Sequence, residues 1–239
     1  MVIDAKPLKH SLLALTGETW KNVRKIVSPT FSQNKVNATA IKDLVEQCVD
    51  QLISEIEKEG SKGKHFNVDV LEKLQAFTLD VISKTALEIE TDVYEKNNEL
   101  MNAVRDFFEH AWNPVVETVL LVDFLKPIVE FIVKFISMGK MTDMVVKHLT
   151  NKVNHICTGQ IDNNNKKNFL RSMITHCANG DITADEFIAN LFLIILAGYE
   201  TTANGITYLL YLLAENKEIQ RTLREEIETN GQESEYIEM

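Results

Sequence analysis

Apolar residues recur every three or four positions along much of this chain, which is the spacing of one face of an α-helix. Leu44, Cys48, Leu52 and Ile56 follow one another at intervals of four, with further apolar residues beside them, so they form one broad apolar face. The same style of pattern continues between residues 70 and 82. These stretches therefore predict two amphipathic helices in the first half of the chain.

The longest predicted helix begins at Thr183. Because Glu186 follows three residues later, the two side chains can form a capping box, which fixes the start of a helix. Every residue from Leu191 to Ala197 is apolar, which predicts that this part of the helix is enclosed on all sides. No strong helix breaker follows before Asn216. We therefore predict a central helix at about 183–215, roughly 48 Å long at about 1.5 Å per residue, which would cross a whole domain.

One more helix is predicted after Asn216, whose side chain can cap its first turn. Ile219, Leu223 and Ile227 are spaced by four and are predicted to form its buried stripe. After Asn230 the helical periodicity ends, and no further element is predicted.

Composition favours one mostly helical unit. The chain has 239 residues, of which 45% are hydrophobic, so it can bury a sizeable core. It contains 9 glycines and 4 prolines, whereas average usage would give about 17 and 12, so few turns and strands are expected. The polar stretches 57–65 and 162–168 predict short linkers, and neither is long enough to separate two domains. We predict a mainly α fold that forms a single partial domain over residues 1–239.

Charge and hydropathy exclude several classes of protein. With 25 basic and 35 acidic residues the formal charge is −10, which argues against a nucleic-acid binder. The first fifteen residues show no signal peptide or membrane anchor. The apolar stretch Val115–Met138 is interrupted by charged residues and by Pro127, and Pro114 precedes it, so it is too polar to span a bilayer. A buried helix pair is the favoured interpretation, with a membrane-surface segment or a lid over a ligand pocket as alternatives.

The three cysteines, at positions 48, 157 and 177, are far apart and belong to no CxxC pair or His/Cys cluster. We interpret them as reduced thiols. Cys48 and Cys177 are expected to serve packing, since free cysteine usually behaves as a small buried hydrophobe. No metal ligand is predicted among them.

The middle of the central helix carries the candidate chemistry. Residues 197–202 read Ala-Gly-Tyr-Glu-Thr-Thr inside an otherwise apolar segment. Glycine in a helix interior costs about 1 kcal/mol relative to alanine, so its presence calls for a reason, such as a large flat group near the backbone. A buried carboxylate is costly without a partner, so Glu200 is expected to meet solvent, a cation or a proton path.

Two structural roles compete with a functional one. Thr201 could donate a hydrogen bond back to the carbonyl of Ala197 and merely bend the helix. Gly198 and Gly205 could allow two helices to pack closely. For a lone small-small-polar triplet these roles would be the better interpretation.

The complete six-residue sequence 197–202 favours a functional role, because it resembles the distal-helix motif [AG]-G-x-[DE]-T-[TS] of the cytochrome P450 family. In that family the helix crosses a heme above its distal face. The resemblance implies that Ala197 and Gly198 lie against the heme. It also implies that Thr201 hydrogen-bonds the activated dioxygen and that Glu200 relays protons from solvent, so these two are the candidate catalytic residues. An axial thiolate on the opposite face of the heme would supply electron density.

A second motif agrees with the first. Trp20 and Arg24 are four residues apart and share one helical face, and they resemble the W-x-x-x-R helix of the same family. Indole N–H and guanidinium are both donors, and in the family they bind a heme propionate. The alternative is an arginine–aromatic stack on a surface helix. The neighbouring basic residues Lys21 and Lys25 would suit docking of an acidic redox partner, although such charge runs are usually solvated faces.

The resemblance covers nearly the whole chain in the family's order, but not all of the family's motifs. Residues 77–92 resemble its T-x-D-V-I helix, with Ala86-Leu87-Glu88 in place of the usual A-F-G. The E-x-x-R helix and the cysteine loop F-x-x-G-x-R-x-C-x-G are not found after the central helix. Glu218–Arg221 fits E-x-x-R by letter only, and Cys157 begins a C-x-G in the wrong context. The chain is therefore expected to lack the axial cysteine and to be catalytically incomplete by itself.

The resemblance implies a heme-dependent monooxygenase that inserts one oxygen atom from dioxygen into a lipophilic small molecule. Electrons would come from an NADPH-dependent flavoprotein reductase. The group that it resembles most is the animal microsomal xenobiotic-metabolising enzymes, which implies the endoplasmic reticulum membrane for the full-length protein. The alternatives left open are a non-catalytic helical relic or a reductase-binding protein, and, far less favoured, an unrelated helical interaction protein.

Overall fold

A computed structural model describes residues 8–32, 39–60, 67–95, 98–111, 147 and 169–230. Within these residues it contains helices and no strand, so the predicted mainly α fold class is confirmed. The elements are, in chain order, η2 (Leu8–His10), α1 (Gly17–Val27), η3 (Ser28–Phe31), α3 (Thr39–Gly60), α4 (Val70–Leu87), α5 (Glu99–Ala111), α9 (Phe169–Ala178), α10 (Ala184–Glu215) and α11 (Lys217–Asn230).

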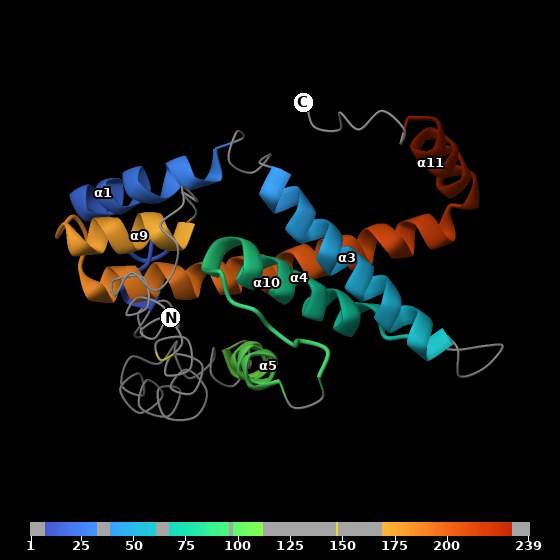
Figure 1. Ribbon diagram of the computed structural model, residues 1–239, viewed down its shortest axis with the longest axis horizontal. Helices are drawn as coiled ribbons and strands as arrows, with labels where there is room; N and C mark the ends of the chain where they lie inside the picture. Colours follow the sequence, from blue (N-terminus) through green and yellow to red (C-terminus); the bar gives the residue numbers. More distant parts are fainter. Residues whose placement is uncertain are drawn as a thin grey trace, which may run out of the picture.

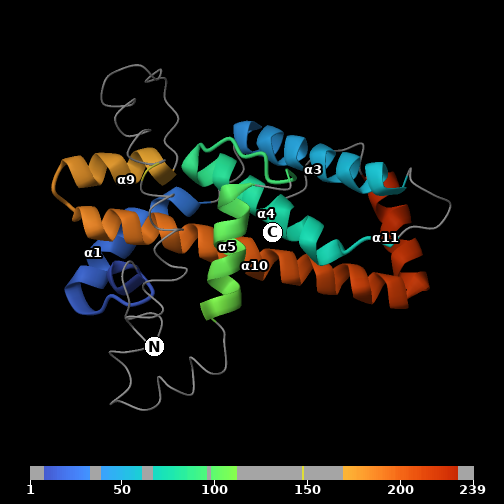
Figure 2. The same cartoon turned by 90° about the horizontal axis from the view of Figure 1, so that it is seen from below.

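Helix α10 is the axis of the structure, as predicted, and its 32 residues run along the length of the molecule in Figure 1. The capping box is present, because Glu186 N–H donates to Thr183 Oγ1 at 3.2 Å and Thr183 N–H donates to Glu186 Oε2 at 2.7 Å. Helices α1 and α9 pack at the N-terminal end of α10, and α4 packs along its middle with α3 beyond it. Helix α5 crosses α10 in Figure 2, and α11 turns away at its C-terminal end.

The N-terminal half of α10 forms the centre of the core. Phe192, Ile195 and Tyr199 are almost completely buried and pack with residues of α4, α5 and α9. Phe107 of α5 meets Phe192 edge to face, with ring centroids 5.6 Å apart. The helix is not enclosed on all sides, however, because Ala197 is exposed and its neighbours 193, 194 and 196 are only partly buried. The prediction of complete enclosure was wrong because it rested on apolarity alone.

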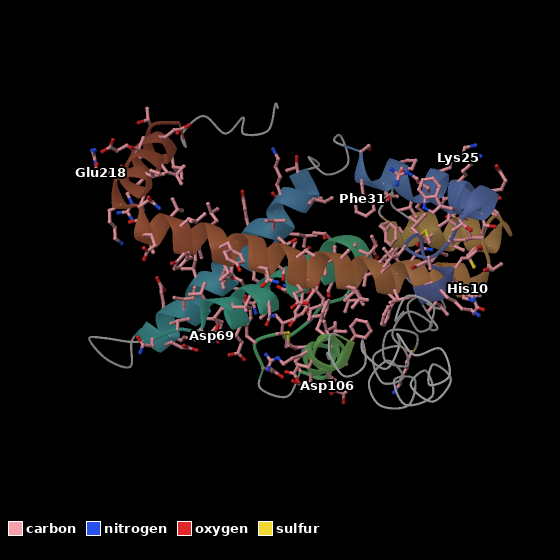
Figure 3. The ribbon with its side chains drawn as sticks, turned by 180° about the vertical axis from the view of Figure 1, so that it is seen from behind. His10, Lys25, Phe31, Asp69, Asp106 and Glu218 are labelled. Atoms are coloured by element: carbon pink, nitrogen blue, oxygen red, sulfur yellow. The ribbon has the colours of Figure 1, made fainter. Side chains whose placement is uncertain are left out.

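The described part of the chain contains one helix, α10, that is long and apolar enough to cross a membrane, and half of its most apolar window is buried against other helices. A capping box at the start and aromatic packing along the first half are features of a core helix. His10 and Lys25 lie at one end of the molecule and Glu218 at the other in Figure 3, so α10 connects the two ends.

The second half of α10 and the whole of α11 expose apolar side chains. The predicted buried stripe of α11 is wrong, because Ile219 and Ile227 are exposed by 60% and 56% and Leu223 by 37%. No described element covers that face, although the helix itself forms where it was predicted. The Asn216 side chain was predicted to cap the first turn of α11, but its amide instead donates to the carbonyl of Leu212 at 2.8 Å and closes α10.

Several predictions concern residues outside the described ones, namely the Val115–Met138 segment with Pro114 and Pro127, the Cys157 site and the linker at 162–168. The linker predicted at 57–65 begins too early, because α3 continues to Gly60. A glycine at the last helical position marks that end better than the polar run does.

A buried polar cluster joins α3, α4 and the loop after α4. Asp80 is completely buried, and its two carboxylate oxygens accept hydrogen bonds from Lys84 Nζ at 2.7 Å and Thr91 Oγ1 at 2.6 Å. Burial raises the pKa of the neighbouring Cys48 to about 12, and the carboxylate of Asp80 adds to the rise. The Cys48 thiol is 1% exposed, which confirms the expectation that it is a packing residue.

This cluster makes stability sensitive to alkaline pH. Because the pKa of Cys48 rises from 9.0 to about 12 on folding, the folded state keeps a proton that the unfolded chain releases above about pH 9. The resulting stability is complete below about pH 9 and is lost toward about pH 12, by up to about 1.4 kcal/mol per pH unit. Urea unfolding between about pH 8 and 11 should show this fall and a shallower one in Cys48→Ala. An equal slope in both proteins would contradict it.

Candidate functional site

The middle of α10 presents a strip of small residues on its exposed face. Ala197, Thr201 and Gly205 are spaced by four, so they lie nearly one above another, and all three are exposed. A Cβ atom placed on Gly205 would meet no atom within 4 Å. Thr201 Oγ1 donates to the carbonyl of Ala197 at 2.6 Å, so the local hydrogen bond that competes with a catalytic role is present. A bulky flat group could approach the backbone along this strip.

Gly198 lies on a different side of α10, about 100° around the helix from Ala197. A Cβ atom at this position would lie 3.0 Å from Cγ1 and 3.1 Å from Cδ1 of Ile82 in α4. Thr78 Oγ1, also in α4, donates to the carbonyl of Tyr199 at 2.7 Å. The geometry therefore supports the helix-packing role for Gly198, and its predicted contact with a heme stays a prediction. Gly205 makes no such close approach.

The two glycines give a matched pair of substitutions. Gly205→Ala is expected to raise the free energy of unfolding by about 0.5–1 kcal/mol, because alanine is the better helix former and the added methyl meets open space. Gly198→Ala gains the same propensity but presses on Ile82, and overpacking costs about 1–3 kcal/mol. In urea unfolding, the free energy of unfolding of Gly198→Ala should therefore be at least about 1 kcal/mol lower than that of Gly205→Ala. Equal stability of the two variants would show that the approach of α4 imposes no constraint.

Glu200 lines an open cavity between α4, α5 and α10. The cavity has a volume of about 480 Å³ and is lined by Asp69, Leu71, Glu72, Gln75, Arg105, Phe108, Glu109, Tyr199 and Glu200. Asp69, which caps the start of α4, and Asp106 of α5 mark the side of α10 on which it lies in Figure 3. Partial burial raises the pKa of the Glu200 carboxyl group above its usual range. Glu200 was expected to meet solvent, a cation or a proton path, and its side chain is partly buried at this pocket.

Tyr199, Arg105 and Glu109 are site residues that the sequence motifs did not reveal. Tyr199 is 1% exposed, and its ring packs on Phe108 with centroids 5.5 Å apart. Its hydroxyl is buried, and burial raises the pKa of Tyr199 to about 12, while the charge of the Arg105 guanidinium and a hydrogen bond from it oppose the rise. Arg105 Nη2 lies 3.1 Å from Glu72 Oε1, which ties α5 to α4 across the cavity. The only sequence signal for α5 was its amphipathic pattern, which says nothing about its partner.

Trp20 and Arg24 lie together on α1. The guanidinium carbon of Arg24 is 5.1 Å from the centroid of the Trp20 ring, so the predicted arginine–aromatic stack is present. Arg24 is exposed and has no ion pair or hydrogen bond among the described residues. Asn22 Nδ2 donates to the carbonyl of Asp181 at 2.8 Å, which holds α1 against the turn before α10. The structure does not bring Trp20 or Arg24 into contact with Ala197 or Thr201, so a group that joined them would have to bridge the two sites.

No described cysteine offers an axial thiolate. Cys48 is buried with a pKa raised to about 12, and Cys177 is partly buried on α9. Within the described ranges, no group of three His, Cys, Asp or Glu side chains is placed to hold a metal ion. That neither cysteine ligates a metal stays a prediction.

The known proteins that this chain resembles all belong to one family. The family model described as Cytochrome P450 matches residues 3–239. The chain is 30% identical over 235 residues to cytochrome P450 3A6 of Oryctolagus cuniculus, a match that covers 93% of this chain and 45% of that protein. It is 29% identical over 262 residues to cytochrome P450 CYP13A7 of Caenorhabditis elegans, covering 95% and 49%. For cytochrome P450 3A7 of Homo sapiens the identity is 27% over 235 residues, covering 93% and 44%.

The chain thus spans about half the length of the curated relatives it matches. The family match extends over nearly all of this chain, and its distal-helix motif stands on the long helix α10 at the centre of the fold. This chain belongs to the cytochrome P450 family.

Proposed function

We propose that this chain forms the oxygen-activating side of a heme-dependent monooxygenase. The observation that carries the proposal is the placement of Thr201 and Glu200 on α10. Thr201 lies on the open strip of small residues, and Glu200, one residue earlier, lines the cavity with α4 and α5. A hydroxyl at an open face and a proton-carrying carboxyl group beside it are what a site for dioxygen reduction needs.

The residues present fit a heme on this face. Ala197, Thr201 and Gly205 leave room for a planar ring at the backbone, since nothing lies within 4 Å of a Cβ atom at Gly205. Arg24, exposed and without an ion pair in the described part of the chain, and the Trp20 indole N–H would donate to a propionate. When bound, heme supplies the binding and reductive activation of dioxygen. The axial ligand would come from residues other than Cys48 and Cys177.

The chain's own residues would handle the protons. Partial burial raises the pKa of the Glu200 carboxyl group, and a carboxyl group beside the open strip could take up and donate a proton. Water in the cavity would reprotonate Glu200. Thr201 Oγ1, whose proton is directed at the carbonyl of Ala197, would turn to donate toward the open strip.

The substrate and the partners follow from the family. We infer a lipophilic small molecule as substrate and an NADPH-dependent flavoprotein reductase as electron donor. Lys21 and Lys25, both exposed on α1, would offer a basic surface to an acidic reductase. We also infer that the full-length protein acts at the cytoplasmic face of the endoplasmic reticulum membrane, where a lipophilic substrate is concentrated.

Expression of the full-length product that contains this chain tests the proposal. With heme and carbon monoxide, the reduced protein should give the difference spectrum of a heme-thiolate centre and should oxidise lipophilic test compounds in the presence of a reductase. Trp20→Phe with Arg24→Ala should lower heme retention, whereas Lys42→Ala on α3 should not. A full-length product that folds, binds a reductase and takes up no heme would instead support the non-catalytic reductase-binding alternative.

A further inference from the structure

Residues 8–15 form a strap that lies on the N-terminal part of α10 and leads directly into α1. The strap is closed by its own hydrogen bonds, because Ser11 Oγ donates to the carbonyl of Leu8 at 2.6 Å and Leu15 N–H donates to the carbonyl of Ser11 at 2.9 Å. The side chains of Leu8 and Ser11 are buried. The first turn of the strap, η2, packs on α10, whereas α1 packs on α9. The strap therefore ties the position of α1 to that of α10.

Asn190 of α10 holds this strap with a single side chain. Its Oδ1 atom accepts a hydrogen bond from Leu12 N–H at 2.9 Å, and its Nδ2 atom donates to the carbonyl of Glu186 at 2.7 Å. Asn190 is 1% exposed, and a buried amide is costly unless its polar atoms are bonded. Both of its polar atoms are bonded here. The bond to Glu186, within the same helix, fixes the direction in which Oδ1 faces the strap.

Asn190 lies on the same face of α10 as the strip of small residues. It precedes Ala197 by seven positions, close to two helical turns, and Thr201 by eleven, close to three. The strap therefore covers this face about 10 Å before Ala197, at about 1.5 Å per residue. Ala197 and Thr201 are exposed, whereas Asn190 is buried under the strap. The strap thus closes the N-terminal end of the open strip.

A second side chain anchors α1 from the other direction. Asn22 Nδ2 donates to the carbonyl of Asp181, in the turn before α10, at 2.8 Å. Trp20 and Arg24 lie two residues before and two residues after Asn22. Figures 1 and 2 both show α1 near the N-terminal end of α10. Two long-range hydrogen bonds, one from the strap and one from α1 itself, therefore set where Trp20 and Arg24 stand relative to the strip.

We propose that Asn190 is a positioning residue for the donor pair Trp20 and Arg24. By holding the strap on α10 it fixes the distance between these donors and the open strip, and Asn22 fixes the other side of α1. A rigid planar group that is seated on the strip and bound by its carboxylate at α1 requires this distance to be constant. The inference rests on the proposed heme site, because it assigns Asn190 a role through the residues proposed to bind a propionate.

Hydrogen exchange of the heme-free chain tests the anchor. In Asn190→Leu the side-chain volume is kept but Leu12 N–H loses its acceptor, so amides 12–15 should exchange at least about 10-fold faster. Thr91→Val is the matched control, because it removes a part-buried hydrogen bond between α4 and the loop after it. It should leave the exchange of the strap unchanged. Unchanged exchange of the strap in Asn190→Leu would overturn the proposal.

Heme release from the full-length product that contains this chain tests the role of the anchor. With excess apomyoglobin as acceptor, Asn190→Leu should release heme at least about 10-fold faster than the parent protein, and Asn22→Ala severalfold faster. Asn22 is exposed, so its variant keeps the fold even if Asn190→Leu does not. With heme dimethyl ester, whose propionates are blocked, both variants should match the parent, because Trp20 and Arg24 then have no carboxylate to bind.

The ester separates positioning from general stability. Equal acceleration of heme and ester release in both variants would mean that Asn190 and Asn22 only stabilise the fold, and it would overturn the proposal. A parent protein that takes up no heme would overturn the proposed heme site and this inference with it. Normal heme uptake with unchanged release from both variants would overturn this inference alone, so the two failures are distinguishable.

Discussion

Replacing Asp80 by alanine is expected to lower the free energy of unfolding by about 3–5 kcal/mol. Asp80 is completely buried, and removing its carboxylate would leave Lys84, whose side chain is only 11% exposed, as an uncompensated buried charge. Burial alone would lower the pKa of Lys84, but the hydrogen bond and the charge of Asp80 reverse this and raise it. Thr91 would lose its acceptor as well. Urea unfolding of the chain at neutral pH measures the loss.

Two further variants separate the charge from the volume of the side chain. Asp50→Ala, an exposed change on α3, should stay within about 0.5 kcal/mol of the parent. The double change Asp80→Leu with Lys84→Met should recover most of the loss, because replacing a buried pair by apolar residues is often neutral or stabilising. A loss below about 1 kcal/mol in Asp80→Ala would mean that water reaches Lys84 and that the cluster is not closed.

Helix ends were predictable where a local signal fixes them. The start of α10 depends on two side chains, Thr183 and Glu186, that bond within one turn, and both bonds are present. Its end depends on Asn216, whose amide bonds back to Leu212. An interaction between residues at most four positions apart can be predicted from the sequence, because both partners are visible in it. The position of α11 was predicted as well, although the Asn216 side chain that was expected to cap its first turn bonds back to Leu212 of α10.

Burial was less predictable, because periodicity identifies an apolar face but not what covers it. The stripe of Ile219, Leu223 and Ile227 has the expected spacing and yet is exposed, since no described helix packs on it. Ala197 belongs to an unbroken apolar run, but it lies on the open side of α10. In both cases the missing information is the position of a second element, which a local pattern does not contain.

The residues of the motif were predictable from local sequence, whereas most residues of the cavity were not. Thr201 and Glu200 were found because they belong to one six-residue string. Arg105 and Glu109 were missed because they reach the site from α5, and the ion pair of Arg105 with Glu72 joins positions 33 apart in sequence. Asp80 carried a local signal that was overlooked, an acid in an apolar helix with a lysine four residues later. Its burial follows only from the packing of α3 on α4.

In the full-length protein that contains this chain, Glu200→Gln is expected to lower the rate of product formation by about 100-fold or more, the usual contribution of a positioned proton donor. Glutamine keeps the shape and hydrogen bonding of the side chain at the cavity, but it does not carry a proton. Heme content should stay unchanged, since the carboxyl group lines the cavity and not the strip of small residues. Product formation and NADPH consumption should be measured together under saturating reductase.

The pH profile separates proton transfer from a purely structural role. Because partial burial raises the pKa of Glu200, the protonated donor persists above the usual range of a glutamate and is lost as pH rises through that raised value. The rate of the parent protein should therefore fall as pH rises through this pKa, and this alkaline limb of the pH profile should be absent in Glu200→Gln. Glu215→Gln, an exposed change on the same helix, should keep both the rate and the limb. If Glu200→Gln loses rate in equal proportion at every pH, then the carboxyl group positions α10 and the protons reach Thr201 by another route.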